Sequence, residues 1–469
     1  MQRNILLITT DTHRVDALKC MGSSFAHSPC IDKLASEGVM FTQAHSVAPV
    51  CMPARCSIMT GLHTPLHGCI ENGVERWDIP FFTDTLKDMG YVCLMSGKTH
   101  FGPMPDSFEK YAPMPRGNHG RLDPVKQIIA DKVVEEEEHP DSLVVTNLFN
   151  MIDEVREEGD KPFFAFCSIN APHQPLDPPG KWANFFKPED IPKLNYQEGE
   201  PYNLPEHLRY LLGLDPDSEI PGRSIDSLSL EKIREVRAKY FSLCAFVDHL
   251  IGKIVDGIDE RGLKENTLII FTSDHGQEYY DHGFNDKHNY FDKSMRVPFI
   301  LRMPGTLPEG ETRKYSLTTD IMPTILGAAG VQTDFANGFD LFSPLVNKED
   351  NPRKCAVASV FRSMAVVTDR WKLEYYYDDD DVRLYNRISD PDESQNLAQD
   401  PNYSSVRDKL LIALLRWRTE LTDVRDLRQR LVEMGPGRAG PVARRSINRL
   451  KTINGRQSEI NLQNKVCIL

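Results

Sequence analysis

The sequence predicts an α/β fold in which a large, mostly parallel sheet is covered by helices on both faces. Short apolar runs rich in β-branched and aromatic residues recur along the chain, among them Ile5–Ile8, Phe163–Phe166 and Leu268–Phe271. Such runs are typical of strands that are buried on both faces of a parallel sheet. Helical patterns lie between them, and this alternation of strands and helices indicates a doubly wound topology.

The clearest helical pattern begins at Leu243. Apolar residues recur from there to Ile258 at spacings of three and four residues, and Gly262 follows as a stop signal. We therefore expect a long helix that packs one apolar stripe against the sheet.

The chain changes character after residue 355. Three short apolar segments separated by turn residues predict antiparallel strands, namely Ala356–Phe361, Met364–Thr368 and Trp371–Tyr377. The acidic run Asp378–Asp381 fits a solvated hairpin tip, because it lacks the spacing and the central glycine of an EF-hand calcium loop. A helix is expected around Val406–Leu421.

These patterns divide the chain into three parts. We predict a large α/β domain over residues 1–355 and a smaller C-terminal α+β domain over residues 356–425. Residues 426–469 form a basic tail, rich in Arg, Gly and Pro beyond Gly435, that is either disordered or wraps a partner subunit of a homo-oligomer.

Composition restricts the class of protein and its partners. A hydrophobic content of 40% with 26% charged residues is ordinary for a folded soluble protein, and the formal net charge of −13 argues against nucleic-acid binding. The sequence shows neither a signal peptide nor an apolar run of roughly 18 residues that would span a membrane. Ten cysteines without paired spacing favour reduced thiols. We therefore expect a cytoplasmic protein without a nucleic-acid or membrane partner.

Polar residues follow four of the predicted strands. They are Asp11, Lys98 with His100, His173, and Asp274. Ligands bind at the carboxyl ends of the strands in open α/β sheets, so these four segments are expected to converge on one pocket.

Cys51 stands just before a predicted helix. Pro53 suits a first helical turn and Ser57–Met59 continue the helix, so Cys51 lies at or beside its N-terminus, where unpaired amides favour an anion. A lone cysteine is usually a small buried apolar residue, and its position alone does not decide its role. Arg55 follows four residues later.

Cys51, Pro53 and Arg55 together form C-x-P-x-R, and residues 57–61 (SIMTG) resemble the S-x-L-T-G stretch that continues it. On these residues the chain resembles the type I sulfatases of the alkaline-phosphatase superfamily. Further similar stretches follow in the expected order, over roughly residues 4–420: ILLITTDTHRVDALKCMG (5–22), SGKTHFG (96–102), APHQP (171–175) and TSDHG (272–276).

The resemblance implies an alkaline-phosphatase-like fold and a sulfuric ester hydrolase. Cys51 is then oxidised by a formylglycine-generating maturation enzyme, and the hydrate of this aldehyde supplies the nucleophilic oxygen. Arg55 is expected to hold that oxyanion, and Lys98 to contact a non-bridging oxygen of the bound group. His100 is expected to take a proton from the remaining hydroxyl, so that sulfate is expelled and the aldehyde is regenerated.

Two further residues follow from the resemblance. His173 would face the leaving oxygen or the transferred group. Counting back from Arg296-Val297-Pro298 places Lys287 where the family has its second lysine, and Lys293 is the alternative.

The resemblance also implies one divalent metal ion. Asp11 and Asp274 would supply carboxylates and His275 a nitrogen, with Thr12 and the residue derived from Cys51 completing the ligands. Calcium is expected first, and manganese or magnesium next. Thr12 stands where many family members have a second acid or an amide, which lowers the negative charge of the site. His275 also occurs in phosphonate monoester and phosphodiester hydrolases of the superfamily, and such an activity is the main alternative.

Two other readings are less well supported. Ser96-Gly97-Lys98-Thr99 ends like a P-loop, but Val92 stands where that motif needs a glycine. A non-catalytic binding protein would not need the metal, lysine and histidine positions that are present. The substrate is expected to be a small-molecule or saccharide sulfate ester, selected by loops such as 103–145 and 176–230.

Overall fold

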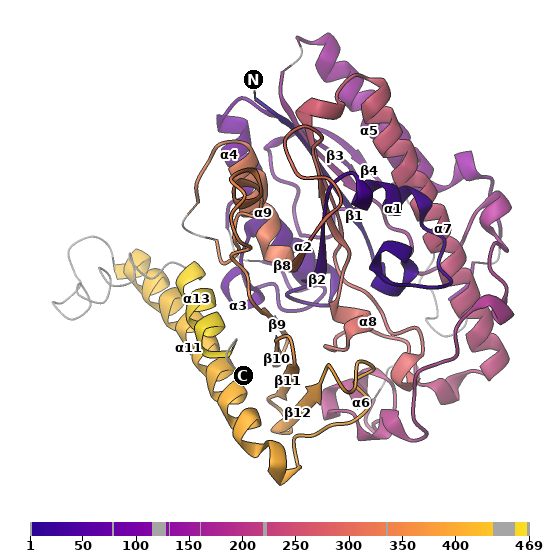
Figure 1. Ribbon diagram of the computed structural model, residues 1–469, viewed down its shortest axis with the longest axis vertical. Coiled ribbons are helices and arrows are strands. Elements are labelled where there is room, and N and C mark those ends of the chain that lie inside the picture. Colours follow the sequence, from indigo (N-terminus) through magenta and orange to yellow (C-terminus); the bar gives the residue numbers. More distant parts are fainter. Residues whose placement is uncertain are drawn as a thin grey trace.

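The computed structural model describes residues 2–76, 79–114, 128–130, 132–159, 161–218, 223–333, 336–434 and 455–466. The strands, labelled as in Figure 1, are β1 (Asn4–Thr10), β2 (Val39–His45), β3 (Val92–Gly97), β4 (Phe108–Pro113), β5 (Phe163–Ser168), β6 (Thr267–Ser273), β7 (Phe299–Arg302), β8 (Glu311–Leu317), β9 (Ala356–Val360), β10 (Ser363–Val367), β11 (Trp371–Tyr376) and β12 (Asp381–Asn386). The α-helices are α1 (Pro29–Ser36), α2 (Cys51–Thr60), α3 (Thr64–His67), α4 (Phe82–Asp88), α5 (Pro140–Glu157), α6 (Glu206–Leu211), α7 (Leu230–Glu260), α8 (Asp292–Met295), α9 (Ile321–Ala328), α10 (Phe342–Val346), α11 (Ser404–Met434) and α13 (Gly455–Val466).

The large sheet has eight strands in the order β4-β3-β5-β1-β6-β7-β2-β8. Strand β1 runs parallel to both β5 and β6, β3 runs parallel to β4 and β5, and β2 runs parallel to β8. Only β7 among the described strands of this sheet is antiparallel to its neighbours. The predicted mostly parallel, doubly wound sheet is therefore confirmed.

Helices cover both faces of this sheet (Figure 1). Side chains alternate between the faces of a strand, so Leu6 and Ile8 of β1 pack with α1, α5 and α7, while Ile5 and Leu7 pack with α2, α4 and α9. Both faces are buried, which explains why β1 is apolar at consecutive positions. Helix α7 contains the predicted stripe but begins earlier, at Leu230, because Ser229 caps its first turn.

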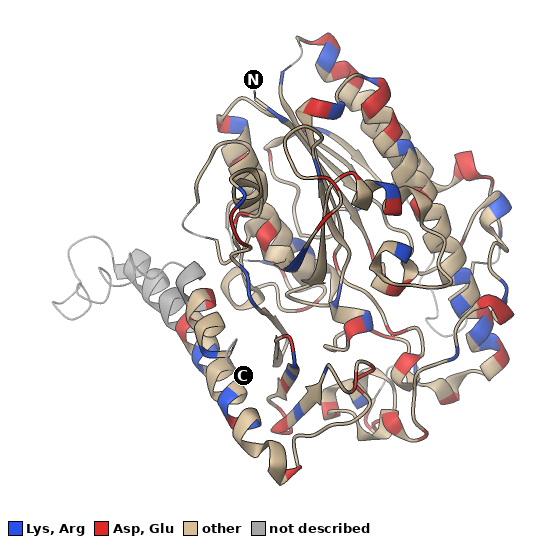
Figure 2. Cartoon of the chain, in the orientation of Figure 1, with Lys and Arg blue, Asp and Glu red and all other residues tan. Residues whose placement is uncertain are grey.

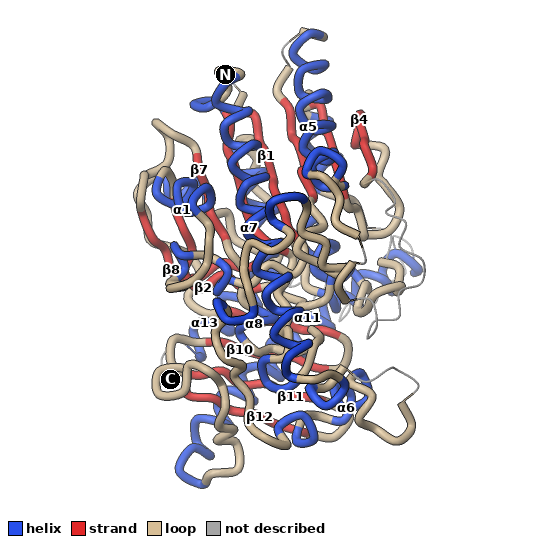
Figure 3. Tube along the Cα trace, turned by 90° about the vertical axis from the view of Figure 1, so that its right-hand side faces the viewer, coloured by secondary structure: helices blue, strands red, loops and turns tan. Residues whose placement is uncertain are grey.

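A second, antiparallel sheet is formed by β12-β11-β10-β9 and lies apart from the large one (Figure 3). This sheet confirms the predicted small α+β unit. Strand β12 was not predicted, because it begins at the last residue of the acidic run and alternates charged with apolar residues. Helix α11 extends beyond its expected end at Leu421.

The small sheet supports the segment that leads into α2. Val47, Ala48 and Val50 share an apolar core with residues of β9–β11, and the Ser359 amide donates to the Val47 carbonyl at 2.8 Å. The position of Cys51 therefore depends on contacts from both sheets.

Part of the expected tail is packed against the rest of the chain. Glu459 of α13 is fully buried, and its carboxylate oxygens lie 2.7 Å from His63 Nε2, 3.0 Å from Arg353 Nη1 and 3.1 Å from Trp417 Nε1. Residues 435–454 and 467–469 of the expected tail lie outside the described part of the chain.

Charged side chains of both signs are interspersed over the outer helices (Figure 2). None of the described helices combines the length and the apolar character that a membrane crossing needs. The nine described cysteines are all free thiols.

Candidate active site

The carboxyl ends of the central strands bring the predicted site residues together. Thr10 of β1 is in register with Ser273 of β6, so the next residues, Asp11 and Asp274, lie side by side. Strand β5 flanks β1 on its other side, and β3, which leads to Lys98, lies beyond it. Parallel neighbours explain why residues far apart in sequence share one edge.

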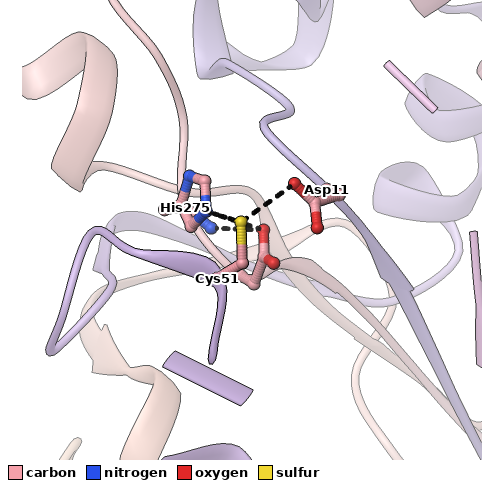
Figure 4. Close-up of side chains that lie close together, drawn as sticks. Asp11, Cys51 and His275 are labelled. Carbon is pink, nitrogen blue, oxygen red and sulfur yellow. Dashed lines mark hydrogen bonds and ion pairs between the residues drawn. The ribbon is translucent and has the colours of Figure 1, made fainter. Parts of the chain in front are cut away.

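Cys51 is the first residue of α2 and is only 2% exposed. Its Sγ lies 3.2 Å from His275 Nε2 and 3.7 Å from Asp11 Oδ1, as Figure 4 shows, and 3.0 Å from Lys287 Nζ. The amide of the next residue, Met52, donates to Asn72 Oδ1 at 3.0 Å. The sequence thus placed Cys51 correctly at a helix N-terminus.

The surroundings of Cys51 favour a negative charge. Burial and the nearby Asp11 carboxylate raise its pKa, but Lys287, His275 and Lys98 outweigh them and hold the pKa of the thiol well below its ordinary value. A nucleophilic oxyanion in the same place is stabilised by the same cationic groups.

Arg55 joins the two carboxylates. Its Nη2 donates to Asp11 Oδ2 and its Nε to Asp274 Oδ2, both at 3.0 Å, and its Nη1 donates to Ser168 Oγ at 2.7 Å. The sequence analysis did not identify Ser168. Its position as the last residue of β5, at the same edge of the sheet as Asp11, is the feature that could have indicated a role in the site.

The two lysines contact different groups of this centre. Lys98 Nζ is 2.7 Å from Asp11 Oδ2, and its side chain is 16% exposed. Lys287 contacts Cys51 directly, whereas Lys293, the alternative, pairs with Asp16 at 2.9 Å. The structure therefore brings Lys287, and not Lys293, to the thiol.

The two predicted histidines differ in their contacts. His173 lies near Lys98 and the Cys51 side chain, and burial together with Lys98 lowers its pKa. His100 is partly buried with its backbone at φ 49°, and its Nδ1 has no hydrogen-bond partner among the described residues. No hydrogen bond within the described chain joins His100 to Cys51.

The centre fits a hard divalent cation. Asp11, Cys51, Asp274 and His275 each offer a ligand atom, and these atoms all lie within 4.8 Å of one another. Burial and the charge of Asp11 raise the pKa of Asp274 to about 7, which is the cost of two adjacent buried carboxylates. The Thr12 hydroxyl is buried and has no hydrogen-bond partner within the described residues. A bound cation would reduce the repulsion between the two carboxylates and would give the Thr12 hydroxyl a partner.

In metal-free protein, the contribution of Asp274 to stability is expected to fall as the pH rises from about 4 to about 8. The folded-state pKa of Asp274, about 7, exceeds its ordinary value of 3.8, so this stabilisation is complete below the ordinary value and is lost as the pH rises through the folded one. A cation replaces the bound proton, so calcium should raise the unfolding temperature more at about pH 8 than at about pH 5. Calorimetry with and without calcium measures both effects. An equal calcium shift at the two pH values would contradict this expectation, and Asp274→Asn should remove only the share of the pH dependence that comes from Asp274, because Glu278 and Glu374 also have pKa values raised to about 7.

The fold and the site define a class, a doubly wound α/β protein with a buried cysteine beside a candidate metal centre. Comparison with protein families agrees with this class: residues 3–331 match the sulfatase family model, and residues 280–420 match the family described as the C-terminal part of N-sulphoglucosamine sulphohydrolase. The chain belongs to the sulfatase family and is a sulfuric ester hydrolase.

Individual relatives cover nearly the whole chain. An arylsulfatase of Clostridium perfringens is 27% identical, over 90% of this chain and 96% of its own. An N-acetylglucosamine-6-O-sulfatase of Bacteroides thetaiotaomicron is 25% identical, over 87% and 85%. Among solved structures, a phosphonate monoester hydrolase of Agrobacterium radiobacter superimposes with a TM-score of 0.78 at 25% identity, over 90% and 96%.

Proposed function

We propose that the chain cleaves a sulfate monoester with the hydrate of a formylglycine that a maturation enzyme forms from Cys51. The position of Cys51 carries this proposal. It begins α2, and Lys287 Nζ lies 3.0 Å and His275 Nε2 lies 3.2 Å from its sulfur. The sulfur stands in for the nucleophilic oxygen, which would be stabilised there by the helix N-terminus and by Lys287.

We further propose that one divalent cation is held by Asp11, Asp274 and His275, with the side chain at position 51 and Thr12 as additional ligands. Calcium fits best because oxygen atoms predominate among the proposed ligands, and manganese or magnesium are the alternatives. Such a cation polarises an oxygen of the bound ester and makes a coordinated hydroxyl more acidic.

The remaining residues have two roles: the arginine and the lysines stabilise negative charge, and the histidines transfer protons. Arg55, Lys98 and Lys287 place three cationic groups around the sulfate position, where negative charge develops. His173 donates a proton to the leaving oxygen, and His100 accepts one from the second hydroxyl at position 51.

A sulfated saccharide is the substrate class that we propose. The relative from Bacteroides thetaiotaomicron is named for 6-O-sulfated N-acetylglucosamine, and its similarity extends over most of both chains. A small aryl or alkyl sulfate is the alternative within the same reaction.

Side-by-side turnover of an aryl sulfate, a phosphonate monoester and a phosphodiester by matured, calcium-loaded protein tests the proposal. We expect the sulfate to be cleaved fastest. If it were the slowest by orders of magnitude, the second candidate, a phosphonate monoester or phosphodiester hydrolase, would replace the first. Two observations favour that candidate: the adjacent Asp274 and His275, and the similarity to a phosphonate monoester hydrolase.

A further inference from the structure

His173 lies on an irregular segment whose ends are both held by the start of one helix. After β5 the chain runs through residues 169–177 without a regular strand or helix. A proton donor must stay within hydrogen-bonding reach of the atom that it serves, and loops are in general more mobile than the elements that they connect. The segment therefore needs contacts that hold His173 in place.

Asp141 supplies the first of these contacts. It is the second residue of α5 and is 1% exposed. Its Oδ1 accepts from the Asn170 amide at 2.8 Å, and its Oδ2 accepts from the Ala171 amide at 3.0 Å. One buried carboxylate thus fixes two successive peptide groups, and His173 follows two residues later.

His139 supplies the second contact. It precedes α5, and its Nδ1 accepts from the Asp141 amide at 3.2 Å. Its Nε2 lies 3.3 Å from Asp177 Oδ1, at the other end of the segment. One end of the segment is therefore hydrogen-bonded to the buried helix start, and the other end lies within ion-pair distance of it.

Contacts within the segment then orient the imidazole. The His173 amide donates to the Asn170 carbonyl at 3.0 Å, which closes a turn on the peptide that Asp141 holds. His173 Nδ1 lies 2.6 Å from the Gln174 carbonyl, which can only accept, so Nδ1 carries the proton of that bond. Nε2 is left for the reacting group, and it can donate a proton only while the imidazole carries protons on both nitrogens.

We propose that the start of α5 is a clamp for His173, in which Asp141 is the principal positioning residue and Asp177 the secondary one. Asp141 does not touch the substrate position; it acts through the peptide groups before His173. This inference rests on the proposed function, because holding His173 in place matters for catalysis only if His173 donates a proton to the leaving oxygen.

The variant Asp141→Asn tests the clamp at nearly constant side-chain size. Its amide nitrogen would face a backbone N–H, so one of the two hydrogen bonds is lost. With matured protein and a series of aryl sulfates, we expect kcat to fall by about 30- to 100-fold for the most basic leaving groups and by less than about threefold for the least basic, with KM nearly unchanged. A steeper dependence of the rate on leaving-group pKa is a signature that a merely structural role would not produce. An equal loss for all leaving groups, or a change in the unfolding temperature alone, would overturn the inference.

Control variants separate the possible failures. Asp153→Asn removes a carboxylate from the same helix, where it pairs with Arg261 at 2.7 Å, and should leave the leaving-group dependence unchanged. Asp177→Asn is a milder second variant if Asp141→Asn does not fold, and about 3- to 10-fold losses with the same signature are expected. No loss, or a uniform one, counts against the clamp.

His173→Ala distinguishes this inference from the proposed function. If that variant shows the leaving-group signature while Asp141→Asn and Asp177→Asn do not, only the clamp is wrong. If His173→Ala lacks the signature, the role of His173 and the clamp both fail. Wild-type protein that cleaves no sulfate ester of the series refutes the proposed function itself.

Discussion

Replacing Cys51 by alanine is expected to lower the turnover of an aryl sulfate by about 10,000-fold or more, because the variant lacks the side chain from which the nucleophile is made. The groups around it belong to other segments: the Lys287 amide donates to Asp286 Oδ1 and the His275 amide to Asp274 Oδ1, and neither bond involves Cys51. Metal binding through the carboxylates should therefore survive, and steady-state kinetics together with metal analysis would show a protein that is loaded but inactive.

Cys56→Ala is the matched control for this variant. Cys56 lies on the same helix and is equally buried, and its Sγ donates to the Phe101 carbonyl rather than to the site. Its loss should reduce stability modestly and change turnover by no more than about threefold. Mass spectrometry of the peptide that contains residue 51 adds an independent measurement. Fully active protein from its native source with an unmodified thiol would contradict the proposed nucleophile.

The variant Asp11→Asn is expected to lose the bound metal and to lower kcat/KM by about 1,000-fold or more. Asp11 is fully buried, and its Oδ2 accepts from both Arg55 Nη2 at 3.0 Å and Lys98 Nζ at 2.7 Å. Together with Arg55, His173 and His275, Lys98 holds the pKa of Asp11 well below its usual range despite the burial, so the carboxylate is charged at neutral pH. A neutral amide neither balances these cations nor attracts a divalent ion.

Asp16→Asn separates loss of the metal from loss of a buried charge. Asp16 lies on the same loop and pairs with Arg14 at 2.6 Å and with Lys293 at 2.9 Å, but it does not contact Cys51. This variant should unfold at a lower temperature while retaining its metal and its activity within a few-fold. Metal analysis and thermal unfolding of both variants check the pair of expectations. Equal metal loss in both, or full metal content in Asp11→Asn, would refute the assignment of Asp11 as a ligand.

Local sequence patterns were sufficient to predict much of the fold and to select the candidate groups of the site. Strand β1 ends one residue before Asp11, and β6 ends one residue before Asp274. Pro53 and the residues after it correctly placed Cys51 at the start of α2. Each of these predictions depends on neighbours within about one turn or one strand.

Other features had a weak local signal or none. Ser168 and Asp141 are an ordinary serine and an ordinary aspartate in sequence, and their importance comes from partners far along the chain, Arg55 and Asn170. Helix α13 lacks a clear apolar period, yet its Glu459 is buried against Arg353 and His63. Strand β12 pairs with β11 although its sequence is partly charged.

The sequence by itself determined which chemical groups this sulfatase possesses and which strands and helices carry them, because hydrophobic periodicity and helix-end signals are short-range properties of the chain. Only the tertiary structure decided which of those groups meet. Arg55 reaches both Asp11 and Asp274 because β1 and β6 are parallel neighbours in register. The segment that carries His173 is hydrogen-bonded to Asp141 of α5. Such contacts depend on strand order and on the packing of distant segments, and no short stretch of sequence records either.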